Sequence, residues 1–513
     1  MMMTKRLADH RDLDALINLL KLRAGEQMYS QEPSIDSQFN NDENDSDDEL
    51  GDADSLAPNL ISSTGLDRLK YKFLDRLAEL ISRKKGGKFV RCSVLHEGEN
   101  KFNVLISSNN DFNHIDSELF QRFVQQWREA ASDVQSRRSC GGTLIDHLNI
   151  SSLTITDMEA PSSKYSNDLW NSITEISKDR VLNNYFVDLK SSMLKLPLAS
   201  LLDLTTFDDA TTKFSEDLYH TFVPGAESGP LAALSPASVD ALVARTYEVR
   251  QRLGSQNEVR KCLTKHPPFA KFWRALCFLG RPRAAFLNFI QIIRHLPDAR
   301  YLKIIQVPPH WAQSCSSSVV PLNLEEALKM LPDQGKAYYT DMKIRKRWSV
   351  TRLNKEYEKI CKHRRYLHAE IQMVLYHLEE GILEEAFTYI GGSKYCCYLC
   401  WIFLRKFGVF RTRGCHDHLY HKWLVPGYET MTAQMDYAVS NTLEALKQKL
   451  ISDISSLTNC SGDVRQESSA GMTTIVQDSA PTSNARESCV QYSSDVADMQ
   501  TRREINFPDY PIG

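Results

Sequence analysis

Long hydrophobic runs are absent from the sequence, and their absence limits what the chain can be. No stretch of its 513 residues reaches the roughly 18 apolar residues that a membrane-spanning helix needs. Segment 1–15 also lacks the apolar core of a secretory signal. We therefore expect an intracellular protein, cytoplasmic or nuclear, with no membrane partner.

The 12 cysteines lack the regular spacing of a disulfide framework, so a small disulfide-stapled scaffold is excluded. Three of them crowd together at Cys396, Cys397 and Cys400. Inside a cell, where thiols stay reduced, such a cluster favours metal or redox chemistry over disulfide bonds.

Basic residues are absent from residues 32–54, which carry ten Asp and Glu. Such a segment buries too little apolar surface to become ordered, so we expect an acidic disordered linker over 31–60. A Ser-rich tail over 456–513, with a net charge of −4, is expected to be disordered as well. Because the whole chain has a net charge of −3, the remainder carries +11, most densely at 343–365. This charge could attract a nucleotide or nucleic acid, although a solvated helix face is the commoner use of such a run.

Hydrophobic periodicity divides the ordered part of the chain into four regions. We expect an N-terminal helix within 1–30, and a helix followed by a β-hairpin (88–96 and 101–108) within 61–110. A mainly α-helical region, with one strand at 301–307, is expected over 111–365. Within 366–455 we expect a helix–strand–helix unit, with its strand at 386–391, and then a last helix. A loop is expected over 133–165, where Ser, Thr and Gly are frequent.

The last of these regions carries a pattern with specific chemistry. The tripeptide His-Ala-Glu at 368–370 is followed by Cys397-x-x-Cys400. A catalytic zinc needs three protein ligands and one open position for water. His368 offers an imidazole, and the two cysteines share one face of a first helical turn, where the helix dipole favours thiolates. Glu370 then lies beside the metal as a proton shuttle, in the pattern of zinc deaminases.

Other interpretations of the same cysteines stay open. Cys397, Cys400, Cys415 and His418 could form a closed structural zinc site, and the protein would then be a non-enzymatic interaction module. A redox dithiol would need a thioredoxin-like βαβ context, which the sequence does not offer. Cys396 with Cys400 is an alternative ligand pair, because residues four apart also share a helix face, but the CxxC spacing favours Cys397.

The segments HAEIQ (368–372) and SKYCCYLC (393–400) resemble the cytidine-deaminase superfamily and, more narrowly, the fungal OTT-type deaminase-like family. The downstream stretch RTRGCHDHLYHKWLVP (411–426) is similar to that family as well. The resemblance implies an α/β fold, a mixed sheet flanked by helices, in which the hairpin supplies the first two strands. Region 111–365 is then a large, mainly helical inserted region. The superfamily usually has proline before its first cysteine, where this chain has Cys396.

Carried over by position, the resemblance makes His368, Cys397 and Cys400 the zinc ligands and Glu370 the catalytic proton shuttle. The implied reaction is hydrolytic deamination of a nucleobase, in a nucleotide or a nucleic acid, by zinc-bound hydroxide. An inactive deaminase-like protein is the alternative. Members of this superfamily often form oligomers, so an oligomer is within expectation here.

Two further residues are candidates for substrate binding. Ser393 precedes the cysteine helix, where it could contact substrate or cap the helix, which is the commoner role of serine. His416 is expected to line the substrate pocket from the next strand or loop.

Overall fold

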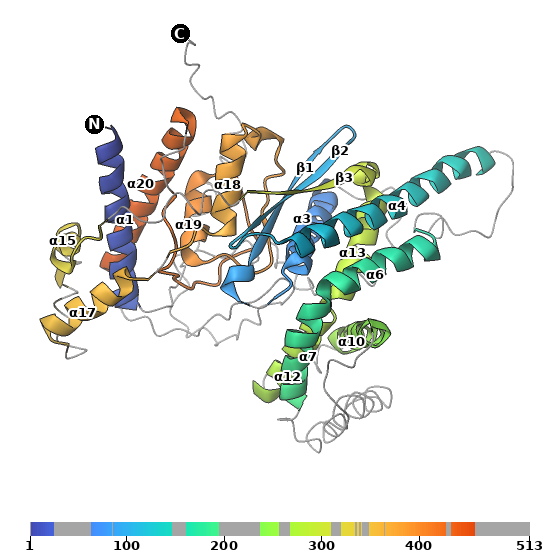
Figure 1. Ribbon diagram of the computed structural model, residues 1–513, viewed down its shortest axis with the longest axis horizontal. Coiled ribbons are helices and arrows are strands. Elements are labelled where there is room, and N and C mark those ends of the chain that lie inside the picture. The colour runs from blue at the N-terminus through green and yellow to red at the C-terminus, as the bar shows by residue number, and fades with distance from the viewer. Residues whose placement is uncertain are drawn as a thin grey trace, which may run out of the picture. The chain divides into compact units, whose positions relative to one another are not determined.

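A four-stranded mixed sheet organises the described part of this computed structural model (Figure 1). Its strands are β1 (Arg91–Gly98), β2 (Lys101–Ser108), β3 (Leu302–Gln306) and β4 (Gly391–Gly392), in the spatial order β3-β2-β1-β4. β1 runs antiparallel to β2 and to β4, whereas β2 and β3 are parallel. The hairpin is therefore confirmed, and the strand expected at 301–307 joins the sheet from within the helical region. The mixed α/β class is confirmed too.

The structure describes residues 2–24, 63–84, 86–145, 161–193, 236–255, 267–308, 320–333, 336–337, 340, 348–363, 365–426 and 432–456. These residues belong to one compact unit of the chain. The acidic linker expected at 31–60, the basic string 343–347 and nearly all of the tail expected at 456–513 lie outside them. No helix among the described residues has both the length and the apolar character that crossing a bilayer requires.

The sheet separates two hydrophobic cores, because successive side chains of a strand point to opposite faces. From β2, Leu105 enters the first core, while Phe102, Val104 and Ile106 enter the second. Cys92 of β1 enters the first core. In Figure 1, α18 and α19 accordingly lie on one side of the hairpin, and α4, α6 and α13 lie on the other.

The first core, here called the site core, packs the sheet against helices from both ends of the chain. These are α1 (Met2–Ala24), α15 (Leu324–Lys329), α17 (Val350–Cys361), α18 (Ala369–Glu379), α19 (Tyr398–Phe407) and α20 (Ala433–Ser456). The apolar stripe expected in the N-terminal helix is buried here, at Leu13, Leu16, Ile17 and Leu20. Lys447 of α20 donates to Asp12 of α1 at 2.6 Å, so the first and last described helices lie against each other.

The second core, here called the helical core, covers the opposite face of the sheet. Its helices are α3 (Ser63–Ile81), α4 (His114–Ile145), α6 (Ser163–Arg180), α7 (Phe186–Met193), α10 (Pro236–Ser255), α12 (Pro267–Leu279) and α13 (Arg281–His295). Four aromatic rings pack together in it, Phe73, Phe123, Trp127 and Phe289, with several centroid pairs 5.5 Å apart. Three short 3₁₀ helices, η2 (Gly87–Phe89), η6 (Pro297–Tyr301) and η7 (Leu383–Glu385), connect longer elements. A π-helical segment, η3 (Val181–Tyr185), joins α6 directly to α7.

The prediction of a loop over 133–165 is wrong for its first part, because α4 continues to Ile145. Ala130, Ala131 and Val134 are buried in the helical core. Of these only Val134 lies inside the predicted loop, where Arg138 also donates to the Arg294 carbonyl at 2.6 Å. These tertiary contacts override the weak local preference of Ser and Gly.

The strand expected at 386–391 is shorter than its sequence predicts. Only β4 joins the sheet as a strand, while Ala386 and Tyr389 form isolated bridges to other segments. A Cβ atom on Gly391 would lie 2.4 Å from the backbone carbon of Leu74. Helix α3 therefore packs directly on the backbone of β4, which requires glycine at this position.

Candidate metal centre

The expected His-Ala-Glu tripeptide lies where helix α18 begins. His368 is the N-cap residue, with an extended backbone (φ −75°, ψ 152°), and Glu370 follows in the first turn. An N-cap residue is not yet helical, so its side chain can face the same side as that of a first-turn residue. His368 is half-buried and Glu370 is buried.

The two spaced cysteines lie at the start of helix α19. Cys397 is its N-cap residue (φ −73°, ψ 162°), and its Sγ accepts a hydrogen bond from the Cys400 N–H at 3.4 Å. Both sulfur atoms consequently belong to one turn. The helix ends at Gly408, whose left-handed backbone (φ 83°) is typical of a helix terminus.

The two helix starts bring one nitrogen and two sulfur atoms together. Nδ1 of His368 lies 3.4 Å from Sγ of Cys397 and 3.4 Å from Sγ of Cys400. All three donor atoms lie within 4.8 Å of one another. A tetrahedral zinc with bonds of about 2.0–2.3 Å spaces its ligand atoms about 3.3–3.8 Å apart. The donor types and their spacing therefore fit a zinc ion with three protein ligands.

The Glu370 carboxylate lies beside these donors. Its Oε2 is 3.6 Å from Sγ of Cys400. Three protein ligands leave one tetrahedral position open, as catalytic zinc sites do and closed structural sites do not. The arrangement thus provides a place for a reacting water molecule next to a carboxylate.

The thiol and imidazole groups shift one another's protonation. Burial alone would raise the pKa of Cys397, but the hydrogen bond from Cys400 and the charge of His368 outweigh it and hold this pKa well below its ordinary value. Burial lowers the pKa of His368, but the charge of Cys397 outweighs burial and raises it. The pKa of Cys400 is well above its ordinary value because this thiol is buried and lies beside Cys397. A metal ion binding here would release protons from these groups.

Burial also raises the pKa of Glu370, and the negative charge of Cys397 acts in the same direction, against the charge of His368. A carboxyl group with a raised pKa holds a proton at a pH closer to neutrality. That property is what proton transfer to and from a substrate requires.

The alternative cysteines do not join this group. Sγ of Cys415 accepts a hydrogen bond from the Asp417 N–H at 3.2 Å, and Sγ of Cys396 donates to Thr412 Oγ1 at 3.4 Å. Among the described residues, the donor atoms that meet are those of His368, Cys397 and Cys400, without Cys396, Cys415 or His418. The closed four-ligand site is therefore not assembled in this part of the chain.

Ser393 lies at the edge of the sheet. Its N–H donates to the Arg91 carbonyl, and its Oγ accepts from the Arg91 N–H, both at 3.0 Å. It does not cap the cysteine helix, because Cys397 does. These contacts give Ser393 a structural role next to β1, and its contact with substrate stays a prediction.

His416 belongs to a cluster of rings that borders His368. The edge of Tyr420 lies against His368, with ring centroids 6.0 Å apart, and His416 meets Tyr420 at 5.6 Å. His418 stacks on Tyr420 at 6.3 Å. His416 is buried, whereas His418 and Tyr420 are half-buried, as His368 is. Tyr420 is not of a residue type that marks a site in the sequence, and its only indication there is its place within 411–426.

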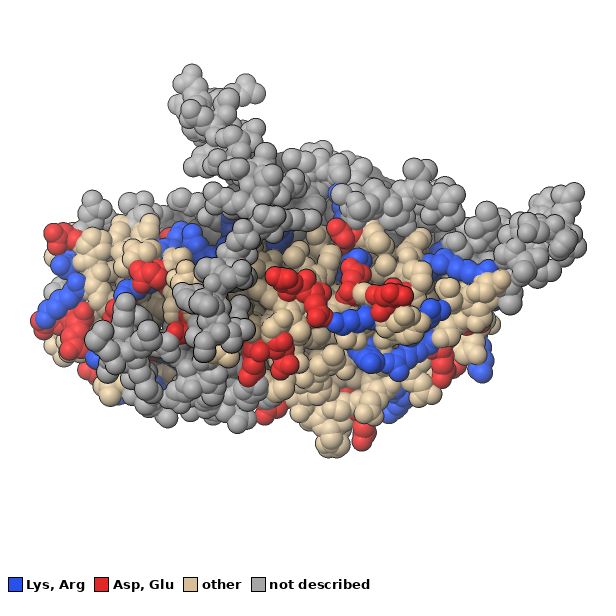
Figure 2. Space-filling view, turned by 90° about the horizontal axis from the view of Figure 1, so that it is seen from above, with Lys and Arg blue, Asp and Glu red and all other residues tan. Residues whose placement is uncertain are grey.

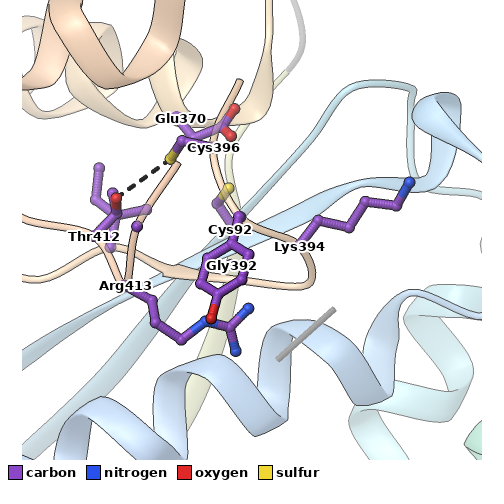
Figure 3. A pocket seen from close by; sticks show the side chains of 10 residues that line it. Cys92, Glu370, Gly392, Lys394, Cys396, Thr412 and Arg413 are labelled. Carbon is purple, nitrogen blue, oxygen red and sulfur yellow. Dashed lines mark hydrogen bonds between the residues drawn. The ribbon is translucent and has the colours of Figure 1, made fainter. Parts of the chain in front are cut away.

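A small cavity, with room for about one water molecule, lies beside Glu370 (Figure 3). Its lining includes Cys92, Glu370, Gly392, Cys396, Thr412 and Arg413. Figure 3 shows Lys394 extending away from the cavity, with its amino group far from Glu370. In the sequence, Cys92 is not at a spacing from other ligand-type residues that would indicate a metal site. It reaches this cavity because β1 pairs it with Gly392 of β4.

Residues 367–427 match the family model described as OTT_1508_deam:-like deaminase. This segment is deaminase-like. It contains α18, β4 and α19, and with them the three donor residues and Glu370. The comparison with curated proteins found no match, and neither did the comparison with solved structures.

The positive charge expected of the chain body is not gathered into one patch on the face shown in Figure 2. Lys and Arg side chains there alternate with Asp and Glu, and acidic groups gather near the middle of the view. Part of the densest basic segment, residues 343–347, lies outside the described residues.

Proposed function

We propose that this protein is a zinc-dependent hydrolase that deaminates a nucleobase carried by a nucleotide or a nucleic acid. One observation carries the proposal: an imidazole and two thiols meet at two helix starts of the deaminase-like segment, with the Glu370 carboxylate beside them. This combination is the one that zinc deaminases of nucleobases use.

His368, Cys397 and Cys400 are the residues that would hold the metal. When bound, zinc supplies a Lewis acid that makes a water molecule reactive near neutral pH. Glu370 accepts a proton from the attacking water at its carboxylate and delivers it to the amino nitrogen, which leaves as ammonia. The oxygen of the water becomes the carbonyl oxygen of the product base, so base and water give deaminated base and ammonia.

Two features support a planar, anionic substrate. The half-buried ring of Tyr420 borders His368, and His418 stacks on Tyr420, so a flat heterocycle could pack against these rings. The chain outside its two acidic segments carries a net charge of +11, which favours a phosphate-bearing partner.

The first experiment measures zinc per chain in the full-length protein and in three variants. His368→Ala removes a ligand, Glu370→Gln removes the proton shuttle, and Cys277→Ala removes a buried cysteine of α12 as a matched control. The same samples are then mixed with nucleosides, nucleotides and single-stranded DNA and RNA, and released ammonia is measured.

We expect about one zinc per chain in the parent, in Glu370→Gln and in Cys277→Ala, and none in His368→Ala. Ammonia release should fall by about 10²-fold or more in Glu370→Gln, since proton transfer typically contributes that much. Zinc retained by His368→Ala would contradict the proposed ligand set. Zinc bound without ammonia release from any substrate would identify an inactive deaminase-like protein instead.

A further inference from the structure

A buried amide connects the turn that carries His368 to the end of β2. Gln372 is 1% exposed. Its Nε2 donates to the Ser108 carbonyl at 2.8 Å and to the Leu367 carbonyl at 2.9 Å. Leu367 directly precedes His368, so this single side chain bridges the sheet and the backbone of a proposed ligand.

Two more hydrogen bonds act on the residue that follows the ligand. Asn109 Oδ1 accepts from the Ala369 N–H at 2.6 Å, and Ser107 Oγ donates to the Ala369 carbonyl at 2.7 Å. Asn109 therefore holds the peptide unit that follows His368, and Gln372 connects the peptide unit that precedes it to Ser108. Ser107 and Ser108 pair with Cys92 and Arg91 of β1, so the sheet fixes these two anchor points, and Asn109 follows directly after the strand.

Packing alone does not account for an amide at position 372. Oε1 of Gln372 is buried and has no hydrogen-bond partner among the described residues. A buried, unpaired acceptor destabilises a fold, and an apolar side chain of similar length would avoid that cost. Both partners of Nε2 are carbonyl oxygens, so the amide can only be oriented with its two donors toward them. The two donors are the property that distinguishes glutamine from an apolar residue here.

We propose that Gln372 is a positioning residue of the metal centre: its amide fixes the Leu367–His368 backbone so that the imidazole meets both cysteine sulfurs. The proposal rests on the proposed function in taking zinc as the metal that the centre binds. Gln372 acts through His368, in the manner of outer-shell residues that orient a ligand.

The test compares two variants of the full-length protein. Gln372→Met keeps the length of the side chain and removes both donors. Val374→Ala is the matched control, because Val374 is fully buried on the same helix and has no polar side-chain atom. For each protein, the zinc Kd is measured by competition with a chromophoric chelator, and the Tm is measured without metal.

We expect Gln372→Met to weaken zinc binding about tenfold, the lower end of the range for outer-shell partners. Val374→Ala should lower the Tm at least as much and leave the zinc Kd unchanged. An unchanged Kd in Gln372→Met, or an equal loss in Val374→Ala, would overturn the positioning role. A parent protein that binds no zinc would overturn this role and the proposed function together. A parent that binds zinc but releases no ammonia would contradict only the proposed activity, and the Kd comparison would still decide the role of Gln372.

Discussion

The two cores on opposite faces of one sheet differ in the polar groups that they bury. The site core encloses thiols, an imidazole pair and the Glu370 carboxylate. Beside the helical core, the buried charges form hydrogen-bonded pairs. One example is the Glu79 carboxylate, which accepts from both Arg281 and Tyr185. Burying ionisable groups is costly unless they are paired or bind a ligand. One face of the sheet therefore buries the groups that we propose to bind metal and transfer protons, and the other face buries the paired charges of a structural core.

The largest effect should come from removing one thiol at a time in the site core. Cys400→Ala should abolish zinc binding, from about one ion per chain to none, because it removes one of three ligands. Cys415→Ala, the matched control, should keep its zinc, because its sulfur lies outside the donor group. Metal analysis of both proteins checks this. Loss of zinc from Cys415→Ala would restore the closed four-ligand site.

A cavity in the helical core should destabilise the fold without changing the chemistry. Phe289 is fully buried and contacts Phe73, Phe123 and Trp127. Phe289→Ala should lower the free energy of unfolding by about 3–5 kcal/mol, as truncations of buried Phe do. Denaturant titration measures this loss, and zinc analysis of the folded variant should still find about one ion per chain. A folded variant without zinc would show that zinc binding on one face of the sheet depends on packing on the other face.

A substitution at the contact between α3 and β4, at the boundary of the two cores, should cause a smaller loss of folding stability. Gly391→Ala places a Cβ atom 2.4 Å from the Leu74 backbone and should destabilise the fold by about 1–3 kcal/mol. Gly87→Ala is the control, because nothing lies within 4 Å of its added Cβ. Thermal or urea unfolding of both variants measures the difference. Equal stabilities would mean that α3 can shift away from β4 at little cost.

The smallest effect concerns a buried histidine pair in the site core. Nε2 of His96 and Nε2 of His377 lie 2.8 Å apart, and burial lowers the pKa of each to about 4. Lys101 lowers the pKa of His96 further, while Glu385 opposes it. An unfolded histidine has a pKa of about 6.5, so the unfolded chain binds more protons between pH 6.5 and 4. Stability from this pair is complete above pH 6.5 and is lost as the pH falls toward 4.

Between pH 7 and pH 6 the loss from this pair should be about 1 kcal/mol. Urea unfolding at several pH values measures the slope. The double variant His96→Gln, His377→Gln should show a shallower slope, because it lacks both titrating groups. The same slope in parent and variant would assign the pH dependence to other residues.

The meeting of His368, Cys397 and Cys400 could be predicted because short-range spacing places each at a helix start. The contacts that hold them could not. Gln372 reaches Ser108 across 264 positions, and Ser393 pairs with Arg91 across 302. Such partners are chosen by how the chain folds back on itself, and no local pattern records that choice.

The same division holds for the fold. The strand at 301–307 could be identified from its apolar run, but its parallel pairing with β2 could not, because parallel strands meet only after a long crossover. The extent of α4 depends on Val134, which packs in the helical core, and on the hydrogen bond from Arg138 to the Arg294 carbonyl. The Ser and Gly residues nearby do not reveal these contacts.

The sheet that both cores share determines how much of the chain a fragment must contain to keep the site intact. Segment 367–427, the part that matches a known family, contains only β4 of the four strands. Expressed alone, it would lack β1 and the anchors at Ser107 and Ser108, and would leave an open strand edge that promotes aggregation. The smallest fragment that keeps both cores therefore runs from α1 to α20, and the helical region is part of it rather than an attachment that can be deleted.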